Sequence, residues 1–293
     1  MRSPLLLVAL LALVAPALAQ DFSKVPVQVH HLRGPVHDVR AAGGNMLAVA
    51  GPDGLLLVDS DYAEMAARVD STLSAMDAGP VRLIVNTHWH FDHVGGNEFL
   101  SRDGAVVVAQ ARTREYMSAP QSLAVIDTEV PASPPAAWPD ICVHDQLTLH
   151  WGDEVVALYH VAGHTDTDLL VHLPVANVLH MGDMLFHGGY PYMDTEHGGS
   201  IDGLIAGVTR ALGLCDDETL VVPGHGPLAG RDDLQTYLAV ITEYRGLVAA
   251  AKGAGQTLEQ VIEAQPAAHL DEQWGQRMFP PSAFMTFIYV SLP

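Results

Sequence analysis

Three histidines and one aspartate are concentrated in the stretch NTHWHFDHVGGN, residues 86–97, as His88, His90, Asp92 and His93. Neighbouring imidazoles repel one another when protonated and need partners when buried, so this clustering requires a reason. A divalent metal ion provides one, because neutral imidazole and carboxylate are ordinary metal ligands. His88 and His90 can point to one side and share an ion, and Asp92 and His93 can then face a neighbouring ion.

Three further short motifs each place one metal-competent side chain beside glycine, just after an apolar run. They are His164 in AGHT, Asp183 in MGDM and His225 in PGHG. Sites are usually built on loops at the ends of rigid strands, and glycine allows sharp turns and close approach there. Five imidazoles and two carboxylates are enough for two divalent ions, with positions left for water or substrate. Zinc suits this donor set, and iron and manganese suit it as well.

Apolar strands and amphipathic helices must position these side chains. The continuous apolar run at residues 81–86 predicts a strand that leads directly into the histidine cluster. The runs at 46–50 and 55–59 predict a hairpin, because the turn sequence GPDG joins them. Apolar residues between 62 and 76 fall on one helical face, with glycine just past the end.

The remainder of the chain continues this alternation of strands and helices. Residues 119–140 are rich in Pro, Ala and Ser and predict one long surface loop. The C-terminal 40 residues are expected to form helices packed on the outside. Further strands are expected at 27–31, 105–109, 147–161 (a hairpin), 168–172, 178–181 and 219–222, and further helices at 113–117, 201–212 and 234–251. This pattern indicates two packed sheets with helices outside, in a single domain.

The motifs together resemble those of a known family. HWHFDH is similar to the HxHxDH signature of the metallo-β-lactamase superfamily, and His164, Asp183 and His225 match its later motifs in order and context. Asp59, in LLLVDS, matches the early aspartate that supports the site without binding the metal. The resemblance covers residues 27–240. It implies an α+β fold, an αββα four-layer sandwich of two mixed sheets with helices on the outer faces.

The resemblance also implies how the ligands are divided. One ion would be held by His88, His90 and His164, and the other by Asp92, His93 and His225. Asp183 would bridge the two ions opposite a bridging water or hydroxide. Two cations would lower the pKa of that water and polarise a substrate carbonyl. Asp92 would act as the catalytic residue that orients the nucleophile and moves its proton.

Departures from known members narrow the expected activity. The β-lactamase subclass with a cysteine ligand needs cysteine where this chain has Asp183, and the lysine that usually follows is absent. We therefore expect a hydrolase of a lactone, ester, thioester or lactam with two Zn²⁺ ions. A β-lactamase, an iron-dependent sulfur dioxygenase and a non-catalytic metal-binding protein remain open alternatives. His187, Tyr190 and Tyr192 follow Asp183 and are equally compatible with substrate contact and loop packing.

Composition limits the partners and the compartment. The formal net charge of −20 and the pI of about 4.9 disfavour nucleic acid and anionic membrane surfaces. The N-terminal sequence MRSPLLLVALLALVAPALAQ predicts a signal peptide at residues 1–19 and a periplasmic or secreted mature domain at 20–293, without membrane insertion. The two cysteines, Cys142 and Cys215, are expected to be separate thiols. The expected partner is a small-molecule substrate.

Overall fold

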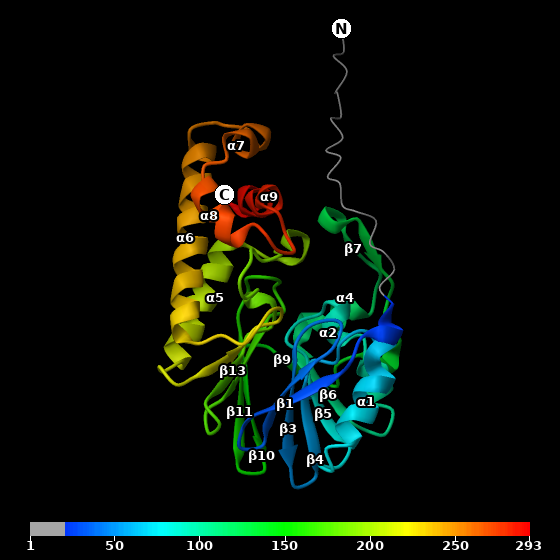
Figure 1. Cartoon of the computed structure of the whole chain (residues 1–293). Helices are drawn as coiled ribbons and strands as arrows, with labels where there is room; N and C mark the ends of the chain where they lie inside the picture. The colour runs from blue at the N-terminus through cyan, green and yellow to red at the C-terminus, as the bar shows by residue number, and fades with distance from the viewer. Residues whose placement is uncertain (1–20) are drawn as a thin grey trace.

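Two β-sheets packed face to face form the centre of the computed structural model, which describes residues 21–293 (Figure 1). The predicted signal peptide, residues 1–19, lies outside the described residues. The seven-stranded sheet comprises, in spatial order, β1 (Gln28–Arg33), β2 (Val36–Arg40), β3 (Met46–Gly51), β4 (Gly54–Val58), β5 (Val81–Val85), β6 (Val106–Gln110) and β9 (Ile141–Val143). The five-stranded sheet comprises β10 (Gln146–Trp151), β11 (Glu154–His160), β12 (Leu169–Leu173), β13 (Val178–His180) and β14 (Leu220–Val222).

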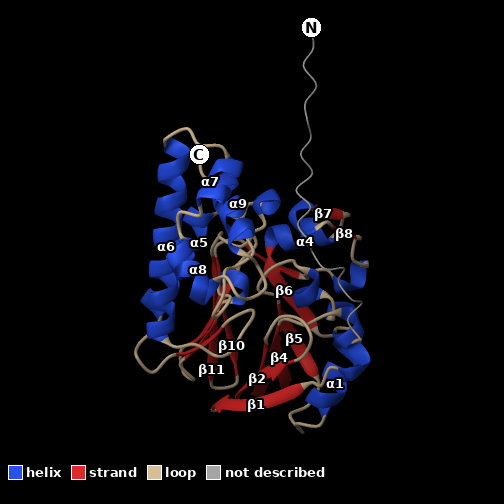
Figure 2. Ribbon diagram, turned by 45° about the horizontal axis from the view of Figure 1, so that its top comes forward, coloured by secondary structure: helices blue, strands red, loops and turns tan. Residues whose placement is uncertain are grey.

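Helices cover the outer faces of both sheets (Figure 2). The side of the seven-stranded sheet carries α1 (Ala66–Ser74), α2 (Phe91–Val94), α3 (Asn97–Leu100) and α4 (Ala111–Met117). The other side carries α5 (Ile201–Leu214), α6 (Arg231–Gly253), α7 (Leu258–Ala264), α8 (Ala268–Trp274) and α9 (Pro281–Ser291). Both sheets contain parallel and antiparallel pairs, so they are mixed as expected.

The side chains of β4 show why its sequence is apolar at every position after Gly54. Leu56 and Val58 belong to the apolar core between the two sheets. Leu55 and Leu57 belong to a second core that also contains residues of α1. A strand buried on both faces has no solvent-facing position, so it does not alternate polar and apolar residues. A third core joins the five-stranded sheet to α5, α6 and α9. These three cores separate four layers, and the predicted αββα sandwich is confirmed.

The carboxyl ends of several strands meet at one edge of the sandwich. Strands β4 and β5 are parallel neighbours, and so are β13 and β14. Their carboxyl ends therefore lie together, and the loops that follow them lie close in space. The residues of interest follow these strands and β11: Asp59 after β4, His88, His90, Asp92 and His93 after β5, His164 after β11, Asp183 after β13, and His225 after β14.

The segment 119–140 differs from the prediction of one long loop. It contains a two-stranded hairpin, β7 (Gln121–Leu123) and β8 (Thr128–Val130). Strands of three residues with mostly half-exposed side chains leave too short a periodic pattern to recognise. The prediction also missed β2 and β9. Strand β2 contains the buried Asp38, which reads as a turn residue but is paired with Arg40 at 2.7 Å.

The C-terminal helices are more closely involved in the core than expected. Phe284, Phe287 and Ile288 of α9 are buried in the same cluster as Tyr190 and Tyr192, from the loop after Asp183. These helices therefore hold the loop that borders the predicted site. No helix among residues 21–293 combines the length and apolar character needed to cross a bilayer. Cys142 is exposed, Cys215 is buried, and both are free thiols.

Candidate metal centre

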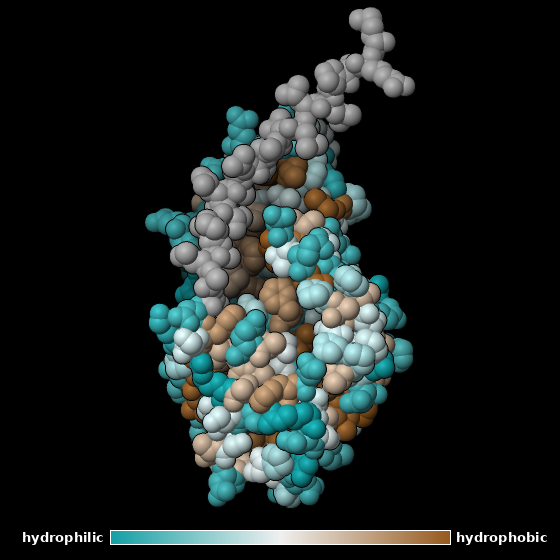
Figure 3. Space-filling view, turned by 90° about the vertical axis from the view of Figure 1, so that its right-hand side faces the viewer, coloured by the Kyte–Doolittle hydropathy of each residue, from teal (hydrophilic) through white to brown (hydrophobic). Residues whose placement is uncertain are grey.

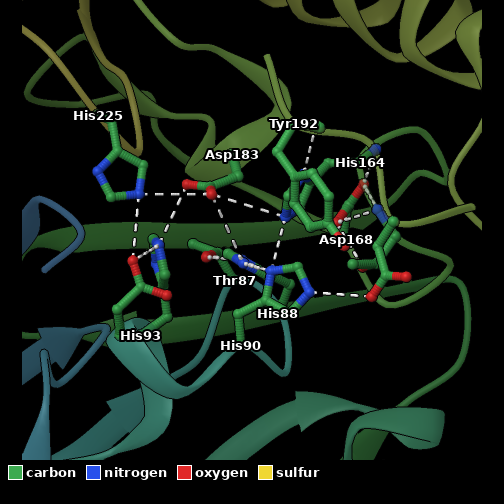
Figure 4. Close-up of polar contacts among 12 residues, drawn as sticks. Thr87, His88, His90, His93, His164, Asp168, Asp183, Tyr192 and His225 are labelled. Atoms are coloured by element: carbon green, nitrogen blue, oxygen red, sulfur yellow. Dashed lines mark hydrogen bonds and ion pairs between the residues drawn. The ribbon is translucent and has the colours of Figure 1, made fainter. Parts of the chain in front are cut away.

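Four side chains from three loops converge in a first group, which comprises His88, His90, His164 and Asp183 (Figure 4). His90 Nδ1 lies 3.1 Å from His88 Nε2 and 2.9 Å from His164 Nε2. Asp183 Oδ2 lies 3.9 Å from His88 Nε2 and 3.6 Å from His164 Nε2. Three imidazole nitrogens and a carboxylate oxygen are a donor set that suits a four-coordinate divalent ion.

Asp92, His93 and His225 form a second group beside the first. Asp92 Oδ2 lies 3.2 Å from His225 Nε2 and 3.7 Å from His93 Nε2. Asp183, which contacts His88 and His164 of the first group, also contacts the second group: its Oδ1 is 3.1 Å from His93 Nε2 and its Oδ2 is 3.4 Å from His225 Nε2. The structure thus brings all seven expected ligands together and divides them as the resemblance implies.

Unpaired polar atoms at the centre of the cluster fit a bound cation. His93 Nε2 and Asp183 Oδ1 are buried and lie 3.1 Å apart, but they do not form a hydrogen bond with each other, and neither has another hydrogen-bond partner among the described residues. Buried polar atoms without partners are costly unless they bind an ion or water. The surrounding backbone also leaves space for them. A Cβ atom at Gly44 would lie 2.1 Å from His93 Cε1, and one at Gly224 would lie 1.9 Å from Asp183 Oδ1. The residues present are therefore compatible with a dinuclear metal site.

Asp59 supports two of the histidines from behind, as expected. It adopts a left-handed backbone conformation (φ 61°) and is fully buried. Its carboxylate accepts hydrogen bonds from the Thr87 amide at 2.7 Å, the Thr87 hydroxyl at 2.8 Å and His93 Nδ1 at 2.8 Å. The Thr87 oxygen is in turn 3.0 Å from His88 Nδ1. These contacts fix the tautomers of His93 and His88, so that each presents Nε2 to the cluster.

Asp194 supports His90 in the same way, and sequence reasoning missed it. Its Oδ2 is 3.0 Å from His90 Nε2 and 2.7 Å from His197 Nδ1. His197 Nε2 in turn lies 3.1 Å from Oε1 of Gln121, in the β7–β8 hairpin. A carboxylate that holds a metal-binding histidine from behind keeps its ring oriented. Asp194 lies 104 positions from His90, and its sequence surroundings, MDTEHG, read as an ordinary turn.

Asp168 fixes the loop that carries His164, and it too was missed. Its carboxylate accepts hydrogen bonds from the backbone amides of Gly163, His164 and Thr165 and from the Thr165 hydroxyl, at 2.6–3.1 Å. His164 Nδ1 lies 2.8 Å from the carbonyl oxygen of Tyr192. These contacts hold His164 Nε2 toward the cluster.

The two groups differ in their electrostatics. Burial pushes the pKa of His88 well below its usual value and that of His164 to about 4, so both are neutral at pH 7. Burial alone would also lower the pKa values of His93 and His225, but the Asp183 and Asp92 carboxylates, together with Asp59 for His93, outweigh it. The pKa of His93 lies well above its usual value and that of His225 is about 10. Without a cation, protons therefore provide the positive charge of the second group.

Zinc stoichiometry is expected to increase with pH, from one ion per chain near pH 6 toward two as the pH approaches 10. Imidazole must lose its proton before it binds a metal, so raised pKa values weaken the second group at low pH. Burial holds the pKa of His88 well below its usual value and that of His164 at about 4, so these two ligands of the first group need not lose a proton near neutral pH. Equilibrium dialysis at fixed, low zinc concentration measures this. Equal pH dependence of the two binding steps would contradict it.

Two cavities border residues of the HWHFDH or PGHG motifs. One, of about 390 Å³, is lined by His225 and by residues of the loop after Asp183 and the segment before α9. The other, of about 220 Å³, is lined by Trp89, Phe91 and residues 130–134. Figure 3 shows the face on the side of α1 and β7, which is hollowed in its upper half with apolar side chains visible inside. Of these two, only the larger cavity is lined by one of the seven expected ligands, His225, so it is the one that offers a substrate apolar walls beside the cluster.

The three expected substrate contacts occupy different positions. Tyr190 lines the larger cavity with its ring, while its hydroxyl donates to Asp271 at 2.7 Å. His187 also lines that cavity, and its Nδ1 is 3.0 Å from the Pro227 carbonyl oxygen. Tyr192 is buried, with its ring centroid 5.8 Å from that of His90. Substrate contact by these residues stays a prediction.

Fold and site together define a class, namely four-layer αββα proteins with a histidine- and aspartate-rich site at one edge that is compatible with two metal ions. Residues 39–225, more than half of the chain, match the family model of the metallo-β-lactamase superfamily. The chain belongs to this superfamily, as the sequence motifs predicted. Membership confirms the expected class of enzyme, a metal-dependent hydrolase.

Several curated proteins are similar in sequence. The 2,4-dinitroanisole O-demethylase subunit alpha of Nocardioides sp. (strain JS1661) is 24% identical over 85% of this chain and 73% of its own length. The hydroxyacylglutathione hydrolase of Maricaulis maris (strain MCS10) is 31% identical over 45% of this chain and 47% of its length. The acyl-coenzyme A thioesterase MBLAC2 of Homo sapiens is 28% identical over 52% and 58%. The chain thus spans only about half the length of the latter two relatives.

Solved structures share the fold at low identity. A metallo-β-lactamase from Pontibacter korlensis superimposes with a TM-score of 0.61 and 21% identity, covering 74% of this chain and 99% of that one. A double mutant of the sec-alkyl sulfatase PisA1 superimposes with a TM-score of 0.70 and 18% identity, covering 90% of this chain and 50% of that one. These likenesses support the αββα fold.

Proposed function

We propose that this chain is an exported, dinuclear zinc-dependent hydrolase that cleaves an acyl bond in a small molecule. The observation that supports it most directly is the position of Asp183, which offers one oxygen to His93 and the other to His225, His88 and His164. A carboxylate shared between two sets of nitrogen donors is suited to two neighbouring ions rather than one.

The chain's own residues would supply the remaining requirements of hydrolysis. Two divalent ions held by the seven residues would lower the pKa of water and polarise an acyl carbonyl. Burial alone would raise the pKa of Asp92, but His93 and His225 hold it at about 2, so Asp92 is a carboxylate at neutral pH. Its side chain remains 15% exposed, so it can accept a proton from a water molecule in the site.

The site and the similar proteins together narrow the class of acyl compound that we expect as substrate. Asp183 stands where a dedicated β-lactamase of one subclass has cysteine, which favours lactones, esters and thioesters over lactams. One relative is named a thioesterase and another a hydroxyacylglutathione hydrolase. We therefore place thioesters and esters first among the compounds to test.

Metal analysis and a hydrolase panel on the mature protein, residues 20–293, test this proposal. We expect two zinc ions per chain and turnover of at least one ester, lactone or thioester that EDTA abolishes and zinc restores. Nitrocefin turnover without lactone or ester turnover would favour the β-lactamase alternative. One iron and no zinc would favour the sulfur dioxygenase. Two bound metals without activity on the whole panel would favour a non-catalytic protein.

Export is the second part of the proposal and has its own test. The N-terminal sequence supports it, with an apolar core followed by the small-residue site Ala17-Leu18-Ala19. N-terminal sequencing of the protein recovered from a bacterial periplasm is expected to begin at Gln20. Recovery of the uncut chain in the cytoplasm would contradict export without bearing on the hydrolase.

A further inference from the structure

Arg277 differs from every other described basic residue. Each other lysine and arginine within residues 21–293 forms an ion pair with a carboxylate or donates to a backbone carbonyl. For Arg277, neither kind of partner is found among the described residues. Five other arginines within this range also lack a carboxylate partner, but each of them donates to a backbone carbonyl. Arg277 has neither kind of partner in the part of the chain that the structure describes, and it is exposed to solvent. Its five N–H donors are available to a ligand.

Arg277 lines the larger cavity, which also contains His225 of the second group. The other walls are largely apolar, formed by Phe186, Tyr190 and Met278. The cavity therefore places a guanidinium group, an apolar lining and a proposed metal ligand around one space of about 390 Å³. This combination suits a molecule with a reactive bond at one end, a short apolar spacer, and an anion at the other.

The surroundings hold the Arg277 segment in place. Phe279 stacks on Tyr192 with ring centroids 5.5 Å apart, and Tyr192 in turn borders His90 and His164. The glycines of the sequence FHGGY leave room for the arginine. A Cβ atom at Gly188 would lie 3.3 Å from Arg277 Nε, and one at Gly189 would lie 2.9 Å from Arg277 Cβ. Side chains at these two positions would therefore compete with the arginine for space beside the cavity.

We propose that Arg277 binds a carboxylate of the substrate, so that the enzyme prefers acyl compounds whose far end is anionic. The inference rests on the proposed hydrolase function. A planar guanidinium matches a carboxylate through two parallel hydrogen bonds, which a lysine ammonium cannot reproduce. Because His225 shares the cavity, the anion lies on the part of the substrate that faces the second group. Arg277 acts on substrate binding and takes no part in bond cleavage.

Paired substrates test this specificity. The acetyl thioester of 3-mercaptopropionate carries the anion, and that of 3-mercaptopropionamide is its neutral counterpart; the corresponding oxygen esters form a second pair. Arg277→Met should raise KM for the anionic member roughly tenfold, with kcat and the neutral member unchanged. Arg277→Lys should recover part of this loss. Arg82→Met is the control, since it removes the same charge near Gly54, at the start of β5.

A binding measurement separates failure of this inference from failure of the hydrolase proposal. Calorimetry with metal-free protein compares succinate with its diamide, and needs no turnover. We expect succinate to bind more tightly than the diamide, and Arg277→Met, but not Arg82→Met, to remove the difference. Thioester or ester turnover with no anion preference and no effect of Arg277→Met would overturn the inference and leave the hydrolase intact. If succinate binding depends on Arg277 but no substrate is turned over, the anion-binding role of Arg277 stands and the hydrolase proposal fails.

Discussion

The Asp183→Ala variant should lose metal and activity together. The two carboxylate oxygens of Asp183 face both groups. Without them, the first group keeps three histidines and the second keeps two histidines and one aspartate, and no ligand is shared. We expect the zinc content to fall from two ions toward one or fewer. Hydrolysis should fall by more than the roughly 10- to 100-fold typical of losing an outer hydrogen-bond partner.

Elemental analysis and kcat/KM on the best panel substrate measure the two effects. Asp183→Asn is the informative companion, because it keeps the volume but removes the charge that attracts two cations. Asp153→Ala, in the exposed turn between β10 and β11, is the control and should change neither quantity. Full occupancy of both sites in Asp183→Ala would refute the bridging role.

The Asp59→Ala variant is expected to weaken both the fold and metal binding. Three buried donors would lose their acceptor, namely the Thr87 amide, the Thr87 hydroxyl and His93 Nδ1. An unsatisfied buried donor costs about 1–3 kcal/mol, so we expect the free energy of unfolding to fall by about 3 kcal/mol or more. Zinc affinity of the second group should fall roughly 10- to 100-fold, because His93 loses the contact that orients it.

A matched variant separates these two effects. Glu154 is also buried and accepts three hydrogen bonds, from the amides of Val155, Val175 and Ala176, but it contacts no histidine of the cluster. Glu154→Ala should therefore destabilise the metal-free protein in urea to a similar degree while leaving zinc affinity unchanged. If Asp59→Ala unfolds more easily but binds zinc as tightly as the parent, Asp59 has a structural role only.

The sequence predicted the cluster well because its members lie in short motifs at strand ends. The strand before His88 is apolar at every position except the exposed Arg82, so its end is easily located. The supporting roles of Asp194 and Asp168 could not be predicted from the sequence. They act through hydrogen bonds in turns, and nothing in a turn sequence distinguishes an aspartate that supports a histidine from one that caps a loop.

Elements with weak periodicity account for the errors in the fold. Strand β2 contains Asp38 in its interior, and the ion pair with Arg40, two residues further along the same strand, makes the burial of this carboxylate tolerable. The β7–β8 hairpin has too few apolar residues to show alternation. The contribution of the C-terminal helices was underestimated, because a sequence of amphipathic helices does not show which loop they pack against. Arg277 was therefore not recognised as a neighbour of His225.

The contact between Gln121 and His197 ties an exposed hairpin to the metal ligands. Gln121 donates its amide group to the carbonyls of Tyr116 and Ala119, which aims its oxygen at His197. His197 and Asp194 then continue the hydrogen-bonded chain to His90. Exposed hairpins usually accumulate substitutions freely. Substitutions in this hairpin are not neutral, because a change at Gln121 alters the hydrogen bonds that orient the metal-binding ring of His90. Metal preference can therefore change during evolution while the metal-binding motifs themselves stay the same.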